Sequence, residues 1–190
     1  MACLFAKGQT NFSANLLEHF TTANGLSHNY ITCMAQDKYG FIWIGTVNGL
    51  NRFDGYSFVQ YINQKGDTTS ISSNYINSIF IDSKGFIWIG TNNGLNRYDP
   101  KKASFRHYKQ QPDQPGSIAS NQVKDICEDN EGFIWVGAAR TLDRLDPATG
   151  MFRHFTPPAR MDNDETLFVE RLIFFDNDIF LSVWGDGVYR

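Results

Sequence analysis

The sequence has few cysteines, no long apolar run and no excess of basic residues, and each shortage excludes a class of protein. Its three cysteines, Cys3, Cys33 and Cys127, stand far apart, so they form neither a disulfide framework nor a CxxC pair for zinc. No apolar stretch approaches the roughly 18 residues of a membrane-spanning helix. The formal net charge is -3. We therefore expect buried free thiols, no membrane span in this chain and no nucleic-acid partner.

The chain also lacks the motifs of common catalytic centres. It has no Gly-x-Ser-x-Gly elbow, no glycine-rich phosphate loop and no dense acidic calcium loop. The four histidines, His19, His28, His107 and His154, do not cluster by spacing. We expect a protein that is not an enzyme and has neither a metal site nor a cofactor.

Aromatic residues and glycines are abundant, and they fall in an internal repeat. Residues 37–54 read Asp-x-x-Gly-Phe-Ile-Trp-Ile-Gly-Thr-x-x-Gly-Leu-Asn-Arg-Phe-Asp, and residues 82–99 and 129–146 repeat this pattern closely. A degenerate fourth copy covers residues 179–190. Counting along the repeat places Leu181 where the other copies have tryptophan and Trp184 where the first has Thr46.

Each copy predicts four short strands separated by tight turns. Aspartate and glycine are suited to the first turn, and Asn-Gly to the second. No segment shows a helical period. Four-stranded antiparallel units at this spacing are typical of propeller blades. We predict an all-β fold, a β-propeller of about four blades, with blades at residues 30–62, 75–108 and 122–155. The repeat tryptophans Trp43, Trp88 and Trp135 should form its structural core between neighbouring sheets.

The two ends of the chain predict a fourth, split blade. Leu16-Leu-Glu-His-Phe20 matches the end of a repeat, Phe105-Arg-His-Tyr108, so residues 16–20 and 168–190 together supply four strands. The propeller is then either a small closed ring or, as we favour, part of a larger one. An open arc would expose apolar surface and favour a homo-oligomer. Residues 1–15 form a separate N-terminal segment, consistent with the remnant of a signal peptide and too short for a whole one.

The repeat, together with the preceding Gly-Leu-Ser-x-Asn, resembles the two-component regulator propeller repeat over residues 16–190. The resemblance implies the sensor region of hybrid two-component systems, which stands in the periplasm. Such regions bind carbohydrate fragments or similar signals and pass a conformational change to a histidine kinase across the membrane. This chain departs from the family pattern because it has no transmembrane helix, no kinase segment and fewer blades.

Positions that break the repeat are the candidate binding residues, since blade building does not explain them. On the face that carries the turn between the second and third strands, Arg140 replaces asparagine and Trp184 replaces threonine, with Asp186 nearby. An aromatic ring beside charged groups suits a sugar. The alternative is an exposed loop that has drifted. Tyr30 and Tyr75 share this face by position, as do Asn29, Asn74 and Asn121, but they recur from blade to blade.

Three functions follow from these observations. The first is a non-catalytic ligand-sensing module, with an oligosaccharide as ligand and a histidine kinase as signalling partner, in a longer chain or as a separate one. The second is a protein-interaction scaffold that assembles by blade stacking. The third, a propeller enzyme, is the weakest, because the inner strands offer acids only at Asp125 and Glu128.

Overall fold

The computed structural model describes residues 17–155 and 168–190, and the predicted N-terminal segment 1–15 lies outside the described residues. A short 3-10 helix, η2 (Thr22–Asn24), precedes the sheets. The strands are β1 (Ile31–Gln36), β2 (Ile42–Thr46), β3 (Gly49–Phe53), β4 (Phe58–Tyr61), β5 (Ile76–Ile81), β6 (Ile87–Thr91), β7 (Gly94–Asp99), β8 (Ser104–Tyr108), β9 (Val123–Glu128), β10 (Ile134–Ala138), β11 (Thr141–Leu145), β12 (Phe152–Phe155), β13 (Val169–Phe175), β14 (Asp178–Val183) and β15 (Gly187–Tyr189).

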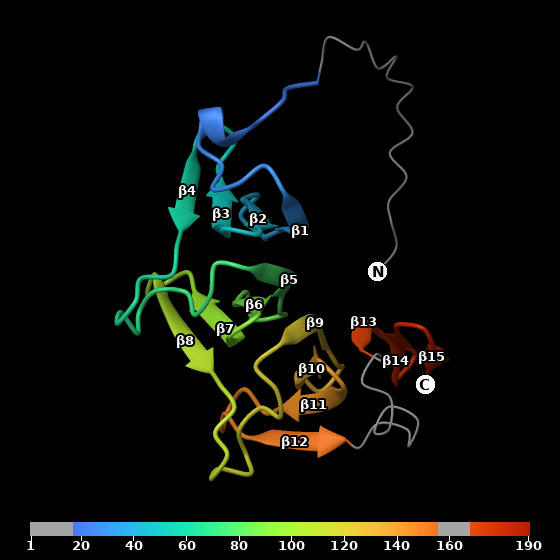
Figure 1. The fold of residues 1–190 in the computed structure, drawn as a ribbon. Helices are drawn as coiled ribbons and strands as arrows, with labels where there is room; N and C mark the ends of the chain where they lie inside the picture. Colours follow the sequence, from blue (N-terminus) through green and yellow to red (C-terminus); the bar gives the residue numbers. More distant parts are fainter. Residues whose placement is uncertain (1–16, 156–167) are drawn as a thin grey trace.

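Consecutive strands pair in antiparallel order to form four sheets, which fan out around a common centre (Figure 1). Blade one contains β1–β4, blade two β5–β8, blade three β9–β12 and blade four β13–β15. The first strand of each blade lies innermost, and the fan is open between β1 and the last blade (Figure 1). The predicted all-β propeller is confirmed, with three strands in the fourth sheet.

Apolar side chains fill the spaces between neighbouring sheets. Trp43 of blade one packs against Tyr98 of blade two, with ring centroids 5.3 Å apart, and Trp88 lies in the cluster between blades two and three. Both tryptophans are fully buried, whereas Trp135 is half-buried. The sheets approach closely because a glycine stands in the second strand of blades one to three, at Gly45, Gly90 and Gly137. A Cβ on Gly90 would lie 2.8 Å from Cγ1 of Val123 in the next blade.

In each of blades one to three, an aspartate in the turn between the first two strands accepts a hydrogen bond from the repeat tryptophan. Asp37 accepts the backbone N–H of Tyr39 and Phe41 on Oδ1, and the indole N–H of Trp43 on Oδ2 at 2.9 Å. Asp82 and Asp129 hold their tryptophans in the same way, at 2.8 and 2.7 Å. The carboxylate thus satisfies a buried donor that would otherwise be costly.

Blade four has neither the aspartate nor the tryptophan. Its first two strands are joined by Asp176 and Asn177, both with positive φ (51° and 67°), as in a tight two-residue hairpin turn. The loss of the repeat tryptophan and the loss of its acceptor therefore occur together, so this position of blade four has no buried indole that would need an acceptor.

Strand pairing corrects the expected register of blade four by one residue. Val183 takes the place of Thr46, since each pairs with the glycine that opens the third strand. Phe180, and not Leu181, therefore stands where the other blades have tryptophan. Trp184 lies one position further, inside the turn. The cause is a turn with one more residue than that of blade one, which counting along a repeat does not reveal.

The segment before η2 lies on blade one instead of blade four. Among residues 17–20 the structure has no strand, and the ring of Phe20 packs 5.0 Å from Phe53 and 5.6 Å from Phe58. The expected pairing of this segment with β15 is therefore absent from the described part of the chain. Phe20 instead shields two aromatic rings of blade one from water, a favourable burial close by in the sequence.

Candidate functional site

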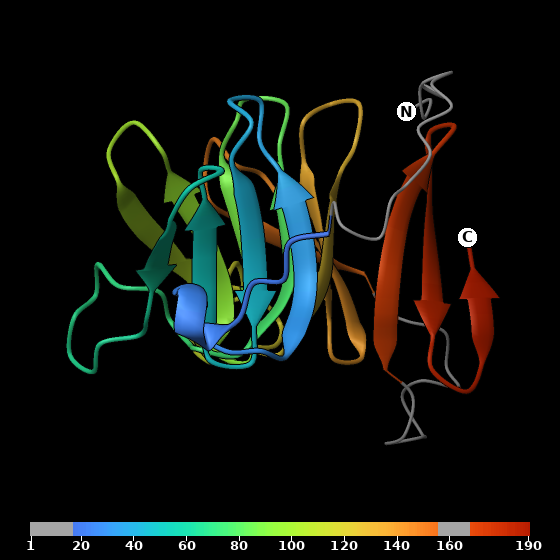
Figure 2. The same ribbon diagram turned by 90° about the horizontal axis from the view of Figure 1, so that it is seen from above.

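The candidate site lies at the end of the blades where the first strands begin, here called the first-strand rim. Antiparallel order brings the loop before each first strand to the same end as the turn between strands two and three (Figure 2, lower edge). Backbone hydrogen bonds join the two in blades one, three and four. The N–H of Val47 donates to the carbonyl of Tyr30 at 3.3 Å, and the N–H of Trp184 donates to that of Phe168 at 2.8 Å.

Exposed aromatic rings mark this rim. Tyr30 is 64% exposed, Tyr75 40% and Trp184 68%. Asn48 and Asn92, in the turns of blades one and two, are exposed as well. Aromatic faces beside amide groups match the apolar faces and the hydroxyls of a sugar ring.

The asparagines that recur before each first strand have a structural role. The side-chain oxygens of Asn29, Asn74 and Asn121 each accept a backbone N–H from the preceding loop, at 2.8, 2.7 and 2.8 Å. These bonds hold the loops that form the rim, so the three residues position the site.

The residues singled out as repeat-breaking, Arg140, Trp184 and Asp186, lie in the rim turns of blades three and four. The two turns form backbone hydrogen bonds with two consecutive residues, Phe168 and Val169. The carbonyl of Ala139, next to Arg140, accepts the N–H of Val169, while the N–H of Trp184 donates to Phe168. The structure therefore places the turns that carry Arg140 and Trp184 on either side of one short segment. The Asp186 carboxylate is engaged by the hydroxyl of Tyr189 in its own hairpin.

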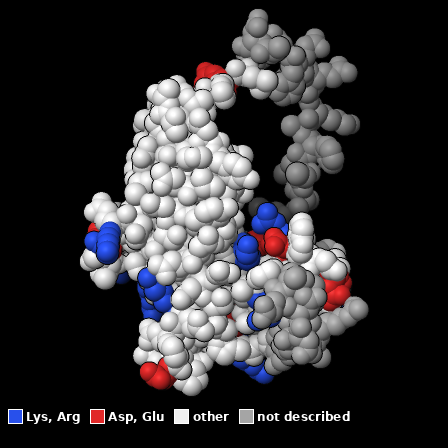
Figure 3. All heavy atoms as spheres, viewed as in Figure 1, with Lys and Arg blue, Asp and Glu red and all other residues white. Residues whose placement is uncertain are grey.

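Charge is unevenly spread over the rim (Figure 3). The face over blades one and two is almost entirely uncharged, and on the inner side basic and acidic side chains lie close together near the beginning of β9 and β13. An uncharged face with exposed rings is suited to a neutral ligand, and the inner edge adds charges of both signs.

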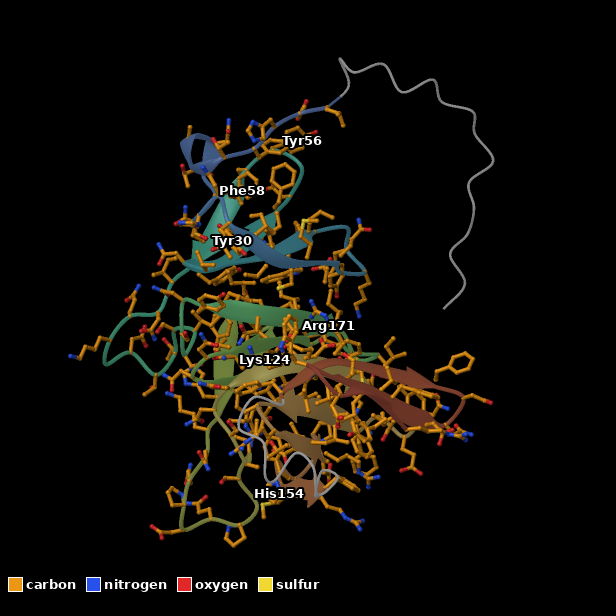
Figure 4. All side chains as sticks on the ribbon, turned by 45° about the vertical axis from the view of Figure 1, so that its right-hand side comes forward. Tyr30, Tyr56, Phe58, Lys124, His154 and Arg171 are labelled. Atoms are coloured by element: carbon orange, nitrogen blue, oxygen red, sulfur yellow. The ribbon has the colours of Figure 1, made fainter. Side chains whose placement is uncertain are left out.

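The sequence analysis missed two basic residues of this inner edge, Lys124 of β9 and Arg171 of β13 (Figure 4). The Arg171 guanidinium lies 3.9 Å from the Asp125 carboxylate. Asp125 accepts the backbone N–H of Leu172 at 2.8 Å, and burial raises the pKa of this carboxyl above its usual value. Both cations break the repeat, because the equivalent positions of the first strands in blades one and two carry neutral residues. A comparison of the first strands, in addition to the turns, therefore identifies them from the sequence.

Blade three also differs in the contact that holds its preceding loop. In blades one and two a buried asparagine, Asn51 or Asn96, accepts a backbone N–H from this loop at 2.9 Å. Blade three has Asp143 instead, which is fully buried and accepts the N–H of Ala119 at 2.8 Å. Its carboxylate also lies 2.8 Å from Nδ1 of His154. A neutral contact is thus replaced by an ionisable pair next to the rim.

The described residues offer little for metal or thiol chemistry. Within them there is no group of three or more His, Cys, Asp and Glu side chains that could hold a metal ion. Burial raises the pKa of the Cys33 thiol to about 11 and that of Cys127 to about 12. In the same part of the chain, no helix has the length and hydropathy needed to cross a membrane.

The two component regulator propeller family matches the chain three times, over residues 25–48, 70–93 and 117–140. Each match covers the loop and the first two strands of one of the first three blades. A histidine kinase of Formosa agariphila is 45% identical over 56 residues, which are 30% of this chain and 4% of that protein.

Solved structures of two bacterial extracellular domains share the fold. The extracellular domain of a putative hybrid two component system from B. thetaiotaomicron is 29% identical with a TM-score of 0.76, and the match covers 91% of this chain and 26% of that one. The extracellular domain of a putative one component system from the same organism is 23% identical with a TM-score of 0.67, over 88% and 24%, and shows the fold alone. The chain thus spans about a quarter of these domains.

Proposed function

The first three blades carry the two-component regulator propeller repeat, and from this premise we propose that the chain is a non-catalytic ligand-sensing module of a bacterial two-component sensor. The similarity to a histidine kinase and to the extracellular domain of a hybrid system supports this role. The signalling partner is a histidine kinase, in a longer chain or as a separate protein. The location that fits this role is the periplasm or the cell exterior.

The ligand that suits the rim is a carbohydrate. The observation that carries this proposal is the group of exposed rings, Tyr30, Tyr75 and Trp184, on a rim that is largely uncharged over two blades. A sugar ring stacks its apolar face on an aromatic side chain and hydrogen-bonds its hydroxyls to neighbouring polar groups. Trp184 has the largest ring, and Arg140 and Asp186 lie on the same side of the fan.

Binding to a panel of oligosaccharides tests the proposal, with Trp184→Ala as the site variant. Tyr56→Ala is the matched control, because Tyr56 is a 97% exposed ring in the turn between β3 and β4, at the opposite end of the blades. We expect an oligosaccharide from the panel to bind the wild-type chain and the control, and to bind Trp184→Ala at least about tenfold more weakly. Failure of the whole panel to bind the wild type would refute the carbohydrate ligand.

A scaffold that assembles into a homo-oligomer is the second candidate. Blade four exposes apolar side chains on its own sheet, with Ile173 62%, Phe175 66% and Val188 70% exposed. A second copy packed on this sheet would remove that surface from water. Sedimentation of the chain over a range of concentrations tests the idea, and a monomer throughout would refute it.

A further inference from the structure

The inner edge of blades three and four carries charges that blade construction does not require. Each first strand contains one bulged residue near its beginning, and these are Thr32, Asn77, Lys124 and Glu170. Blades one and two have neutral side chains at this position and at the next one, Cys33 and Ser78. Blade three has Lys124 and Asp125, and blade four has Glu170 and Arg171. A neutral residue therefore satisfies the bulge, and the charges have another cause.

The two cations are available to a ligand. Within the described ranges, the Lys124 ammonium forms no hydrogen bond or ion pair, either with Glu170 or with any other residue. The Arg171 side chain is 63% exposed, and its 3.9 Å separation from Asp125 is too long for a hydrogen bond. Asp125 instead directs one oxygen at the Leu172 N–H. The guanidinium donors are therefore not consumed by this neighbour.

The position of the cations links them to the rim. β9 and β13 lie side by side along the inner edge (Figure 1), and Lys124 and Arg171 occupy their beginnings, next to the rim loops. The Arg171 guanidinium lies 3.9 Å from the Asp125 carboxylate of β9, so it stands where these two first strands meet. A ligand that lies across the rim would bring its inward-facing substituent to this point.

We propose that Lys124 and Arg171 form a subsite for an anionic substituent of the sugar, a carboxylate or a sulfate ester. This inference rests on the proposed carbohydrate function and narrows its ligand to an acidic oligosaccharide. An ammonium and a guanidinium both donate charge-assisted hydrogen bonds to such oxygens, and the guanidinium can do so with two parallel bonds. The uncharged rings of the rim then bind the neutral part of the chain of sugars.

Calorimetric titration of the whole chain with three matched probes tests the subsite. The probes are an oligogalacturonate, its methyl ester, in which the charge is removed and the rings are kept, and a sulfated galacto-oligosaccharide of equal length. The site variant is Lys124→Asn with Arg171→Ser, which installs the residues that blade two has at these positions. Lys84→Asn is the control, because Lys84 lies in the turn at the opposite end of blade two. Thermal unfolding of each variant verifies that it is folded, and Arg171→Lys retains the charge should serine destabilise the blade.

We expect at least one acidic probe to bind the wild type about tenfold or more tightly than the methyl ester, and a rise in ionic strength to reduce this advantage. The site variant should lose the preference while its affinity for the ester stays unchanged, and Lys84→Asn should keep it. Preference for the carboxylate or for the sulfate ester identifies the source of the charge. Equal affinity for acidic and neutral probes would overturn the subsite and leave the carbohydrate function standing. Absence of binding by all three probes and by the wider panel would overturn both.

Discussion

Replacing His154 with alanine tests whether the ionisable pair of blade three stabilises the loop that leads to the rim. The imidazole joins the Asp143 carboxylate to the carbonyl of Pro115, with both distances 2.8 Å. Asp143 is fully buried, and its other oxygen accepts the N–H of Ala119 at 2.8 Å. The variant therefore leaves a buried carboxylate with one donor in place of two.

The magnitude follows from the burial of the two partners. Leaving a buried acceptor without its partner costs about 1–3 kcal/mol, and more when it is charged. His154 is 40% exposed, so solvent screens part of its interaction and water can enter the vacated space. We expect a loss of about 2 kcal/mol in the free energy of unfolding. For a domain of this size that is a fall of roughly 4–8 °C in Tm.

The effect should depend on pH. Burial by itself lowers the pKa of His154, but the hydrogen bonds to Asp143 and Pro115 and the attraction to the carboxylate outweigh it and raise the pKa above 6.5. A histidine with a pKa raised by folding contributes stability that is complete below its unfolded pKa and is lost as the pH rises through the folded value. The variant should therefore lose more stability at about pH 6 than at about pH 8.5.

Urea unfolding of three variants at both pH values separates the pair from the ring itself. His154→Ala with Asp143→Asn replaces the buried carboxylate by the amide of the other blades, and it should recover part of the loss. His107→Ala removes the equivalent ring of blade two, which faces Asn96 instead of a carboxylate. A loss in His154→Ala that is the same at both pH values, or no recovery in the double variant, would refute the reasoning.

The remaining predictions concern the blades and the thiols. Asp82→Ala removes the acceptor of a buried indole and of two backbone N–H groups, so we expect a loss of about 3 kcal/mol or more in urea unfolding, and a loss under 1 kcal/mol would contradict this role. Gly90→Ala places a Cβ 2.8 Å from the Val123 side chain and should lower Tm by several degrees, whereas an unchanged Tm would show that the blades separate at little cost. With pKa values of about 11 and 12, Cys33 and Cys127 should react with a thiol reagent at least about 100-fold more slowly in the folded chain than in urea at about pH 8, and comparable rates would contradict their burial.

Local patterns in the sequence predicted the blades well. The Asp-x-x-Gly turn, the alternation around Trp43 and the Asn-Gly turn each act within a few residues, and antiparallel pairing of neighbouring strands follows from them. The bonds from Asp37 to its turn and to the indole repeat in two further blades, so the repeat in the sequence is a repeat of physical contacts. Departure from the repeat identified Arg140 and Trp184 for the same reason, as positions that these contacts leave unexplained.

Only the tertiary structure decided the register of the last blade, which charged residues of neighbouring blades meet, and where the segment before η2 lies. Turn length sets the register of the last blade, and it moved Trp184 by one position. Asp125 and Arg171 come together because blades three and four pack side by side, and the chain between them carries no local signal of that contact. Phe20 covers blade one instead of joining β15. The sequence by itself determined contacts within a blade, which span a few residues, and packing between sheets decided those that join residues far apart along the chain.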